Sequence, residues 1–420
     1  MKDKTFMEDL KNQILQQVYN NFVNSIGYNG CSIYDIGYDC TQDELLQCLI
    51  ELIKEGEIEI ITGDIRNTYI KSFDAESIEK QITLLPSLSF SDYSIYPTER
   101  VLENKRDVSS FNDRPFSKML ALGKPQLKCR FFNIDILRHY ATDPRYDYRF
   151  RDYFGSIYSY NTVEDSEAIY LNSFSIGRNG DDYVVVVFLR DLNFLPAVAQ
   201  QKWYSKMIVD SSKCLVLKNF LDNQLLGSWC FPRTVFRAII EEIENLYVLT
   251  KHIWGKTIVS NYYLRDDDRL RDFEMLLLPT NRNLDEFYRQ LEIITVENLN
   301  KDFFCLDEFG LDLFSYTQDG DYQIKQAKGT LQLLKEWLQI VKPECVKEIH
   351  GVLNEVRATR SKGRAHNLLK PQYSKDFYTE QFDISGKVFN ALNVFRRIIQ
   401  THPRAKGVAI PHDSNYYVEI

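Results

Sequence analysis

The chain lacks any apolar run long enough to cross a lipid bilayer. Its longest strongly apolar stretch, residues 183–189, is far shorter than the about 20 residues that a spanning helix needs. The first residues are charged and are not followed by an apolar segment with a small-residue cleavage site, so a secretory signal peptide is not expected. The sequence therefore predicts a protein without a membrane partner.

Cysteine pairs are lacking as well. Eight cysteines are spread along the chain without a C-x-x-C pair: Cys31, Cys40, Cys48, Cys129, Cys214, Cys230, Cys305 and Cys345. In a chain of 420 residues, this spacing predicts reduced thiols in a cytoplasmic protein rather than a disulfide framework or a zinc site.

Several common catalytic motifs do not occur in the sequence. It contains no G-x-S-x-G and no H-E-x-x-H, and its Gly255-Lys-Thr257 triplet has Thr250 where the first glycine of a Walker loop would stand. The sequence therefore predicts neither a metal site nor a cofactor.

The composition is that of a folded globular protein, with 44% hydrophobic and 26% charged residues. A length of 420 residues suggests two to four domains. We predict an α+β multidomain fold with a winged-helix-like domain at 1–75, a β-rich middle domain at 76–233, a helical connector at 234–282 and an all-α bundle at 283–420.

Charge is unevenly distributed along the chain. The net charge is −8, yet from Lys328 to the last residue fifteen Lys and Arg oppose nine Asp and Glu. The part before Lys328 is correspondingly acidic. We expect an anionic partner, RNA or another nucleic acid, to bind the basic C-terminal part.

The N-terminal pattern resembles a winged helix. Apolar residues repeat at helical spacing over 6–23, and Thr41 with Glu44 forms a capping box before a second helix. An alternating segment at 57–61 is expected to turn and return through 68–71 as a wing. Many DNA-binding modules use this arrangement.

The charges of this region argue against DNA binding. Between Thr41 and Asp74, eight acidic residues oppose three basic ones, and phosphates would repel such a surface. We therefore expect the acidic winged helix to bind a partner protein or to be purely structural, with DNA binding as the alternative.

The middle region predicts a β-hairpin. Strands are expected at 169–176 and 183–189 around a turn at 178–180, because Asn-Gly is a strong tight-turn signal and four consecutive valines suit a buried strand. Residues 143–154 interleave arginine with aromatic residues. This segment is expected to be an aromatic strand with solvated charges, and single-stranded nucleic-acid binding is the alternative.

The C-terminal part is helical. Helical spacing is found at 234–254 and then in four predicted bundle helices at 284–304, 329–341, 344–360 and 374–401. On the third of these, Arg360 falls on the same inward stripe as Leu353 and Val356. A buried arginine needs an anionic partner. Between Arg357 and Lys375 there are six basic residues and no acid, so the local sequence offers none.

The segment Arg360-Ser-Lys-Gly-Arg-Ala-His366, at the end of a helix in an all-α bundle, resembles the R-x5-H motif of the HEPN superfamily. Many members of that superfamily are metal-independent ribonucleases of toxin–antitoxin, CRISPR-associated and phage-defence systems. The resemblance implies a homodimer, because the groove generally forms between two bundles. Other stretches, such as residues 329–337, are similar to those of bacterial proteins, so a bacterial origin is expected.

The resemblance also implies roles for individual residues. Arg360 would stabilise charge on a phosphoryl group, and His366 would be the general acid or base. The residues expected to hold the nucleic acid are Arg357, Lys362, Arg364 and Lys370. Two other functions remain open: a non-catalytic adaptor that binds protein and nucleic acid, and a DNA-binding transcription regulator.

Overall fold

The computed structural model describes residues 4–25, 29–36, 40–62, 70–228, 233–263, 273–319, 322–360, 372–413 and 415–418. Helices and strands both occur, as expected for an α+β chain. The chain divides into two compact units: unit 1 contains Met1–Arg149 and Phe154–Trp229, and unit 2 contains Phe150–Tyr153 and Cys230–Ile420. None of the described helices combines the length and the apolar character that a bilayer crossing requires.

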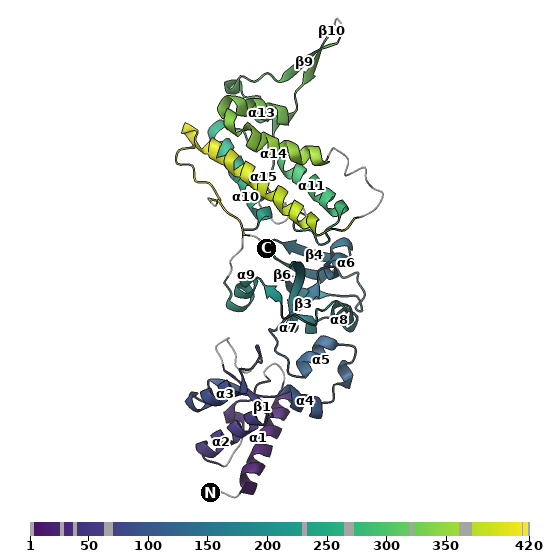
Figure 1. Ribbon diagram of the computed structural model, residues 1–420, viewed down its shortest axis with the longest axis vertical. Coiled ribbons are helices and arrows are strands. Elements are labelled where there is room, and N and C mark those ends of the chain that lie inside the picture. Colours follow the sequence, from purple (N-terminus) through teal and green to yellow (C-terminus); the bar gives the residue numbers. More distant parts are fainter. Residues whose placement is uncertain are drawn as a thin grey trace. The chain divides into compact units, whose positions relative to one another are not determined.

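Unit 1 begins with the two predicted helices (Figure 1). The Thr41 hydroxyl accepts a hydrogen bond from the Glu44 N–H, and the Glu44 carboxylate accepts one from the Thr41 N–H, which confirms the predicted capping box. The helices and strands of this part are α1 (Lys4–Asn24), α2 (Gln42–Lys54), β1 (Ile58–Thr62), α3 (Ile78–Leu84), β2 (Tyr93–Pro97), α4 (Glu99–Lys105) and α5 (Pro115–Ala121).

The described partner of β1 differs from the predicted wing. β1 pairs antiparallel with β2, with Ile60 opposite Ile95, and Ile95 also forms a bridge with Cys31. Residues 63–69 lie outside the described part, and Ile70 and Lys71 are not in a strand. All five residues of β2 are buried. A strand that is buried throughout does not alternate between apolar and polar residues, so it lacks the sequence pattern by which an exposed strand is recognised.

The acidic residues of this region are largely neutralised. Five of the eight acids between Thr41 and Asp74 form ion pairs within unit 1: Glu51 and Glu55 with Lys11, Glu57 with Arg100, Glu59 with Lys71 and Asp74 with Lys128. The surface is therefore less negative than the residue count suggests, which weakens the electrostatic argument against DNA.

The rest of unit 1, together with Phe150 and Arg151 of unit 2, forms a six-stranded sheet. Its order is β3–β7–β6–β5–β4, with β8 also pairing with β6. The predicted hairpin is confirmed: β6 and β7 are antiparallel, Gly180 at the turn has a φ of 59°, and Val184 to Val187 are buried. The elements are β3 (Cys129–Asn133), α6 (Ile136–Thr142), β4 (Tyr146–Arg151), β5 (Phe154–Ser159), β6 (Tyr170–Asn179), β7 (Asp182–Phe188), α7 (Leu189–Asn193), α8 (Ala197–Tyr204), β8 (Cys214–Val216) and α9 (Lys218–Leu221).

A buried glutamine of α8 caps the start of α5. The Gln200 side chain is fully buried, and its carbonyl accepts hydrogen bonds from the N–H groups of Phe116 and Ser117 at 3.0 and 3.2 Å. Its amide donates to the Leu195 carbonyl at 2.9 Å. These bonds satisfy helix N-terminal donors that have no partner within α5 itself.

Replacing Gln200 by alanine is expected to lower the free energy of unfolding by about 1–3 kcal/mol, because buried N–H groups of α5 would lose their acceptor. Urea denaturation followed by circular dichroism measures this change. The exposed neighbour Gln201 is the matched control, since Gln201→Ala removes the same atoms from the surface of the same helix. Equal unfolding free energies for the two variants would contradict the prediction.

Unit 2 is a helical bundle with an inserted β-ribbon. Figure 1 shows α10, α14 and α15 lying together, and α10 packs along α15. The helix that the sequence assigned to a connector is thus part of the bundle. The bounds are α10 (Val235–Trp254), α11 (Asn281–Thr295), α12 (Lys301–Phe304), β9 (Phe314–Asp319), β10 (Tyr322–Ala327), α13 (Thr330–Val341), α14 (Val346–Thr359) and α15 (Asp376–Gln400).

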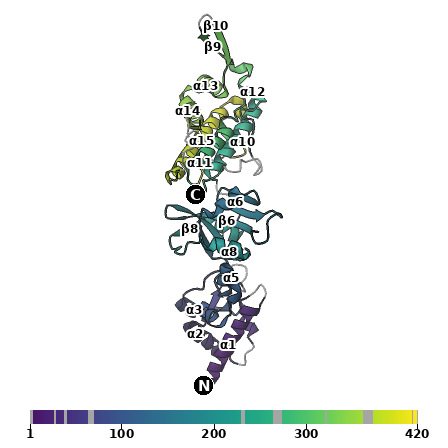
Figure 2. The same cartoon turned by 90° about the vertical axis from the view of Figure 1, so that its right-hand side faces the viewer.

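Two features of unit 2 differ from the sequence prediction. The helix expected over 284–304 is interrupted after α11, where the Asn298 amide donates to the Asn261 carbonyl and its side-chain oxygen accepts from the Asn261 N–H, both at 2.8 Å. The second feature is the antiparallel ribbon of β9 and β10, which had no counterpart in the prediction. Figure 2 shows this ribbon extending away from the bundle helices.

Candidate functional site

The predicted site lies at the C-terminal end of α14. Arg360 is the residue that caps this helix, and Arg357 is exposed in its last turn. The inward stripe of the helix is confirmed by the burial of Ile349, Leu353 and Val356. The other predicted site residues, Lys362, Arg364, His366 and Lys370, lie outside the described residues.

Arg360 forms ion pairs with two carboxylates near the end of α11. Its Nη1 atom lies 3.0 Å from Glu292 Oε2 and 3.7 Å from Glu297 Oε1. The Glu292 side chain is only 4% exposed, whereas that of Arg360 is 45% exposed. The Glu292 carboxylate is therefore nearly buried, whereas about half of the Arg360 side chain that pairs with it faces solvent.

An inward Arg360 requires either a carboxylate partner or an anion in a polar groove, and the structure shows a carboxylate partner. The segment around Arg360 contains no acid, but α11 packs against α14 and supplies one. The full burial implied by the inward stripe is wrong, because α14 ends at Thr359 and Arg360 extends from the helix end. One sequence feature pointed to Glu292: it is a carboxylate beside Leu291 on the buried face of α11.

The ion pairs leave part of the guanidinium for another anion. Both contacts of Arg360 with the described carboxylates use Nη1. A guanidinium carries five N–H donors on three nitrogens, so a half-exposed one can bind phosphate oxygens in addition to a carboxylate. The arrangement provides a fixed positive charge with outward-facing donors, which is the property that a phosphate site requires.

The described histidine of α14 cannot act together with Arg360. His350 lies ten residues before Arg360, which corresponds to about 15 Å along a helix. Burial, and then the charge of Lys335, lowers the pKa of His350 below its usual value. A neutral imidazole at that distance neither binds the same phosphate nor exchanges a proton at it.

A second polar cluster lies between α10 and α15. The Arg396 and Glu242 side chains are 2% and 0% exposed, and Arg396 Nε lies 2.6 Å from Glu242 Oε2. The amide of Asn393 donates to Glu242 Oε1 at 3.0 Å, and Arg396 Nη2 donates to the side-chain oxygen of Asn415 at 2.8 Å. The charges compensate each other, so this cluster fastens the two helices together.

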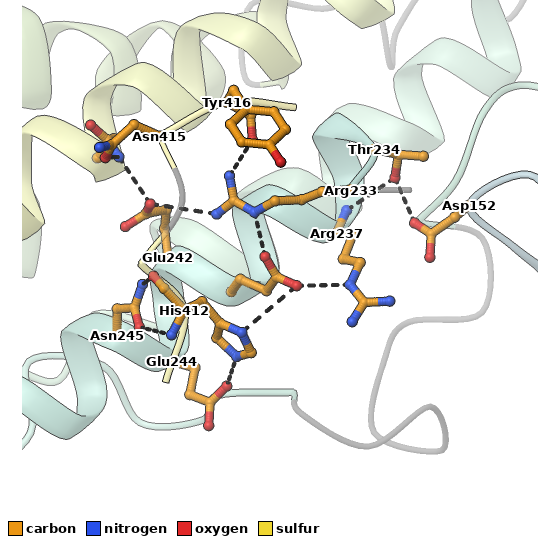
Figure 3. Close-up of polar contacts among 12 residues, drawn as sticks. Asp152, Arg233, Thr234, Arg237, Glu242, Glu244, Asn245, His412, Asn415 and Tyr416 are labelled. Atoms are coloured by element: carbon orange, nitrogen blue, oxygen red, sulfur yellow. Dashed lines mark hydrogen bonds and ion pairs between the residues drawn. The ribbon is translucent and has the colours of Figure 1, made fainter. Parts of the chain in front are cut away.

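Other residues in α10 and just before it hold the segment that follows α15 (Figure 3). Arg233 Nη1 donates to the Tyr416 carbonyl at 2.5 Å, and the Asn245 amide donates to the His412 carbonyl at 2.8 Å. The His412 ring lies 2.5 Å from a carboxylate oxygen of Glu244. We call the described residues of this segment, 412, 413 and 415–418, the strap, because these contacts fix them against α10.

The strap region also predicts a pH dependence of stability. Burial alone would raise the pKa of Glu241, but hydrogen bonds from Arg237 and Arg233 hold this pKa below its usual value. A carboxyl with a lowered pKa in the folded state stabilises the fold above the unfolded pKa of about 4.3, and this stabilisation is lost as the pH falls further. Urea denaturation between neutral and acidic pH should show a shallower acid-side decline for Glu241→Gln than for the wild type.

Among the described residues, no group of three or more His, Cys, Asp and Glu side chains is arranged to hold a metal ion. The chain matches no protein-family model, and comparisons with curated proteins and with solved structures gave no significant match.

Proposed function

We propose that the protein is a HEPN-like ribonuclease that cleaves RNA without a metal ion, with Arg360 and His366 as its catalytic residues. One observation carries the proposal: a half-exposed guanidinium at the end of α14 is held through Nη1 by the nearly buried Glu292. The donors on its remaining nitrogens suit a phosphate. The run of basic residues that follows in the sequence adds attraction for RNA.

In the proposed reaction, the 2′-hydroxyl of RNA attacks the adjacent phosphorus. A bond forms between the 2′-oxygen and phosphorus, and the bond to the 5′-oxygen of the next nucleotide breaks. His366 makes one of the two proton transfers, from the 2′-hydroxyl or to the leaving 5′-oxygen, and solvent water makes the other, so that the 5′-oxygen leaves as a hydroxyl. Arg360 stabilises the negative charge that builds on the phosphoryl oxygens. Arg357, Lys362, Arg364 and Lys370 hold the flanking phosphates.

The proposal includes the finer domain order and the biological setting. A winged-helix-like region would bind a partner protein, a β-containing middle region would follow, and the C-terminal bundle would carry the catalytic site and form a homodimer. The setting would be the bacterial cytoplasm, in phage defence or as a toxin. None of the cysteines that the structure describes is in a disulfide, and the proposed compartment is a reducing one.

The decisive experiment is an RNA cleavage assay in EDTA with purified protein. Wild-type protein is expected to cleave single-stranded RNA and to leave 2′,3′-cyclic phosphate ends, whereas Arg360→Ala/His366→Ala is expected to be inactive. Lys342→Ala is the control, since Lys342 is a similarly exposed cation, paired with Glu344, near the opposite end of α14. Equal cleavage by wild type and the double variant, or none by the wild type, would refute the proposal.

The ion pairs of Arg360 favour a second candidate, a non-catalytic adaptor. In that case Arg360 is mainly structural, and the basic part of the bundle binds nucleic acid without turnover. Salt-dependent RNA binding by fluorescence anisotropy, with no product in the cleavage assay, would support the adaptor. A partner protein captured by residues 1–75 would support it further.

A further inference from the structure

The ribbon of β9 and β10 exposes an unusual combination of side chains. In an antiparallel pair, residues opposite each other share a face. Phe314 lies opposite Ala327, Tyr316 opposite Lys325, and Gln318 opposite Gln323. These six residues make up one side of the ribbon, which we call the aromatic face. The two aromatic residues and Lys325 are exposed.

We propose that the aromatic face binds single-stranded RNA. Exposed rings on a β-surface stack on unpaired bases, and a nearby cation holds the phosphate. Phe314 and Tyr316 are two residues apart on one strand, about 7 Å at the usual rise, so each ring can stack on a different base. This inference rests on the proposed function, in which RNA is the substrate. The role it gives to the ribbon is to bind that substrate.

The charges of the aromatic face suit RNA. None of its six residues is acidic, and Lys325 Nζ lies 3.8 Å from the centre of the Phe314 ring. The ammonium group therefore covers one side of the Phe314 ring, and a base that stacks on that side would displace it toward the phosphate of the same nucleotide. The amide of Gln323 adds hydrogen-bonding groups that suit base edges.

A second copy of the chain fits the aromatic face less well. Aromatic residues are common at protein interfaces, but lysine and alanine are depleted there, and this face carries Lys325 opposite Tyr316 and Ala327 opposite Phe314. Ile324, which is exposed, lies opposite Thr317 on the other side of the ribbon. A contact between two copies would therefore use the Ile324 side, which makes the two uses of the ribbon separable by mutation.

The ribbon is anchored to the bundle at its base. The Lys328 N–H donates to the Leu313 carbonyl at 3.0 Å, and Lys328 Nζ lies 2.9 Å from Glu336 on α13. A two-stranded ribbon is only marginally stable by itself. These contacts hold its ends, and the aromatic face remains accessible to a ligand.

The test is the affinity of full-length protein for a fluorescent oligouridylate with 2′-O-methyl groups, which cannot undergo 2′-hydroxyl attack. Phe314→Ala and Tyr316→Ala are each expected to raise the Kd by at least about five-fold, because one stacking contact is lost in each. The matched control is Thr317→Ala, on the same strand but on the other side. An RNA duplex of equal length is expected to bind equally to wild type and variants.

Three outcomes would overturn the inference: no binding of the oligouridylate by wild type, equal Kd values for the wild type and the aromatic variants, or equal losses for Thr317→Ala. A change of mass in sedimentation for Ile324→Ala, with unchanged Kd values for the aromatic variants, would instead assign the ribbon to self-association. If the wild-type protein cleaves no RNA and the aromatic variants bind the oligouridylate more weakly than the wild type, the RNA-binding role of the ribbon would be supported and the proposed ribonuclease activity would be refuted.

Discussion

Replacing Arg360 by alanine is expected to lower the rate constant of RNA cleavage by about 10²–10³-fold, the usual loss when a donor to a developing oxyanion is removed. The expected effect is on kcat, because Arg360 is proposed to bind the transition state more strongly than the substrate. Arg360→Lys is expected to retain only part of the activity, since a lysine cannot hold Glu292 and a phosphate with separate nitrogens. Single-turnover kinetics with excess enzyme measures the chemical step.

The same substitution also leaves Glu292 without its closest cation. A nearly buried carboxylate without a partner destabilises a fold, so Arg360→Ala is expected to lower the melting temperature as well. The double variant Arg360→Ala/Glu292→Gln removes both charges and is expected to recover much of this stability. It should remain inactive, which separates the loss of catalysis from the loss of folding.

Two results would contradict this prediction. One is cleavage by the double variant at the wild-type rate, which would show that Arg360 serves only to compensate Glu292. The other is an unchanged rate for Arg360→Ala itself at a temperature where circular dichroism shows it to be folded. Lys342→Ala, which also removes one exposed cation near α14, should match the wild type in both rate and stability.

Replacing Arg396 by alanine is expected to destabilise unit 2 by about 3–5 kcal/mol, the cost of breaking a buried ion pair by removing one partner. Glu242 is fully buried, and it would keep only the hydrogen bond from Asn393 and the longer contact with Arg233, whose Nη2 lies 3.7 Å from Glu242 Oε1. Asn415 would lose its hydrogen bond from Arg396 too, so the strap should loosen. Urea denaturation measures the first effect, and limited proteolysis of residues 412–418 measures the second.

The matched control for Arg396 lies on the same helix. Lys387 pairs with Glu355 at 2.9 Å, but both side chains are about half exposed. Exposed pairs contribute at most about 1 kcal/mol, so Lys387→Ala should change the unfolding free energy little. Similar losses for Arg396→Ala and Lys387→Ala would contradict the role of burial in this argument.

Local patterns in the sequence predicted the local parts of the fold. The capping box at Thr41 and the Asn-Gly turn at Gly180 each depend on neighbours within a few residues, and both are confirmed. The partner of β1 could not be predicted in this way. β2 is buried along its whole length, and its pairing with β1 is decided by tertiary packing.

The candidate site also combines a part that local sequence predicts with a part that tertiary packing decides. The inward stripe of α14 predicted where the helix packs, and Arg360 was identified from that stripe. Its ion-pair partners lie at the end of α11, far away in sequence, so no local count of acids could reveal them. A search for carboxylates on otherwise apolar helix faces would have identified Glu292.

The pairing of α10 with α15 has a consequence for synthesis on the ribosome. More than a hundred residues separate Trp254 at the end of α10 from Asp376 at the start of α15, so this contact closes a long loop. The bundle cannot close until α15 and the strap have left the ribosome, and Glu242 stays without Arg396 until then. A nascent chain therefore carries Arg360 before the bundle around it is complete, and the proposed cleavage of RNA would have to wait until α15 and the strap have been translated.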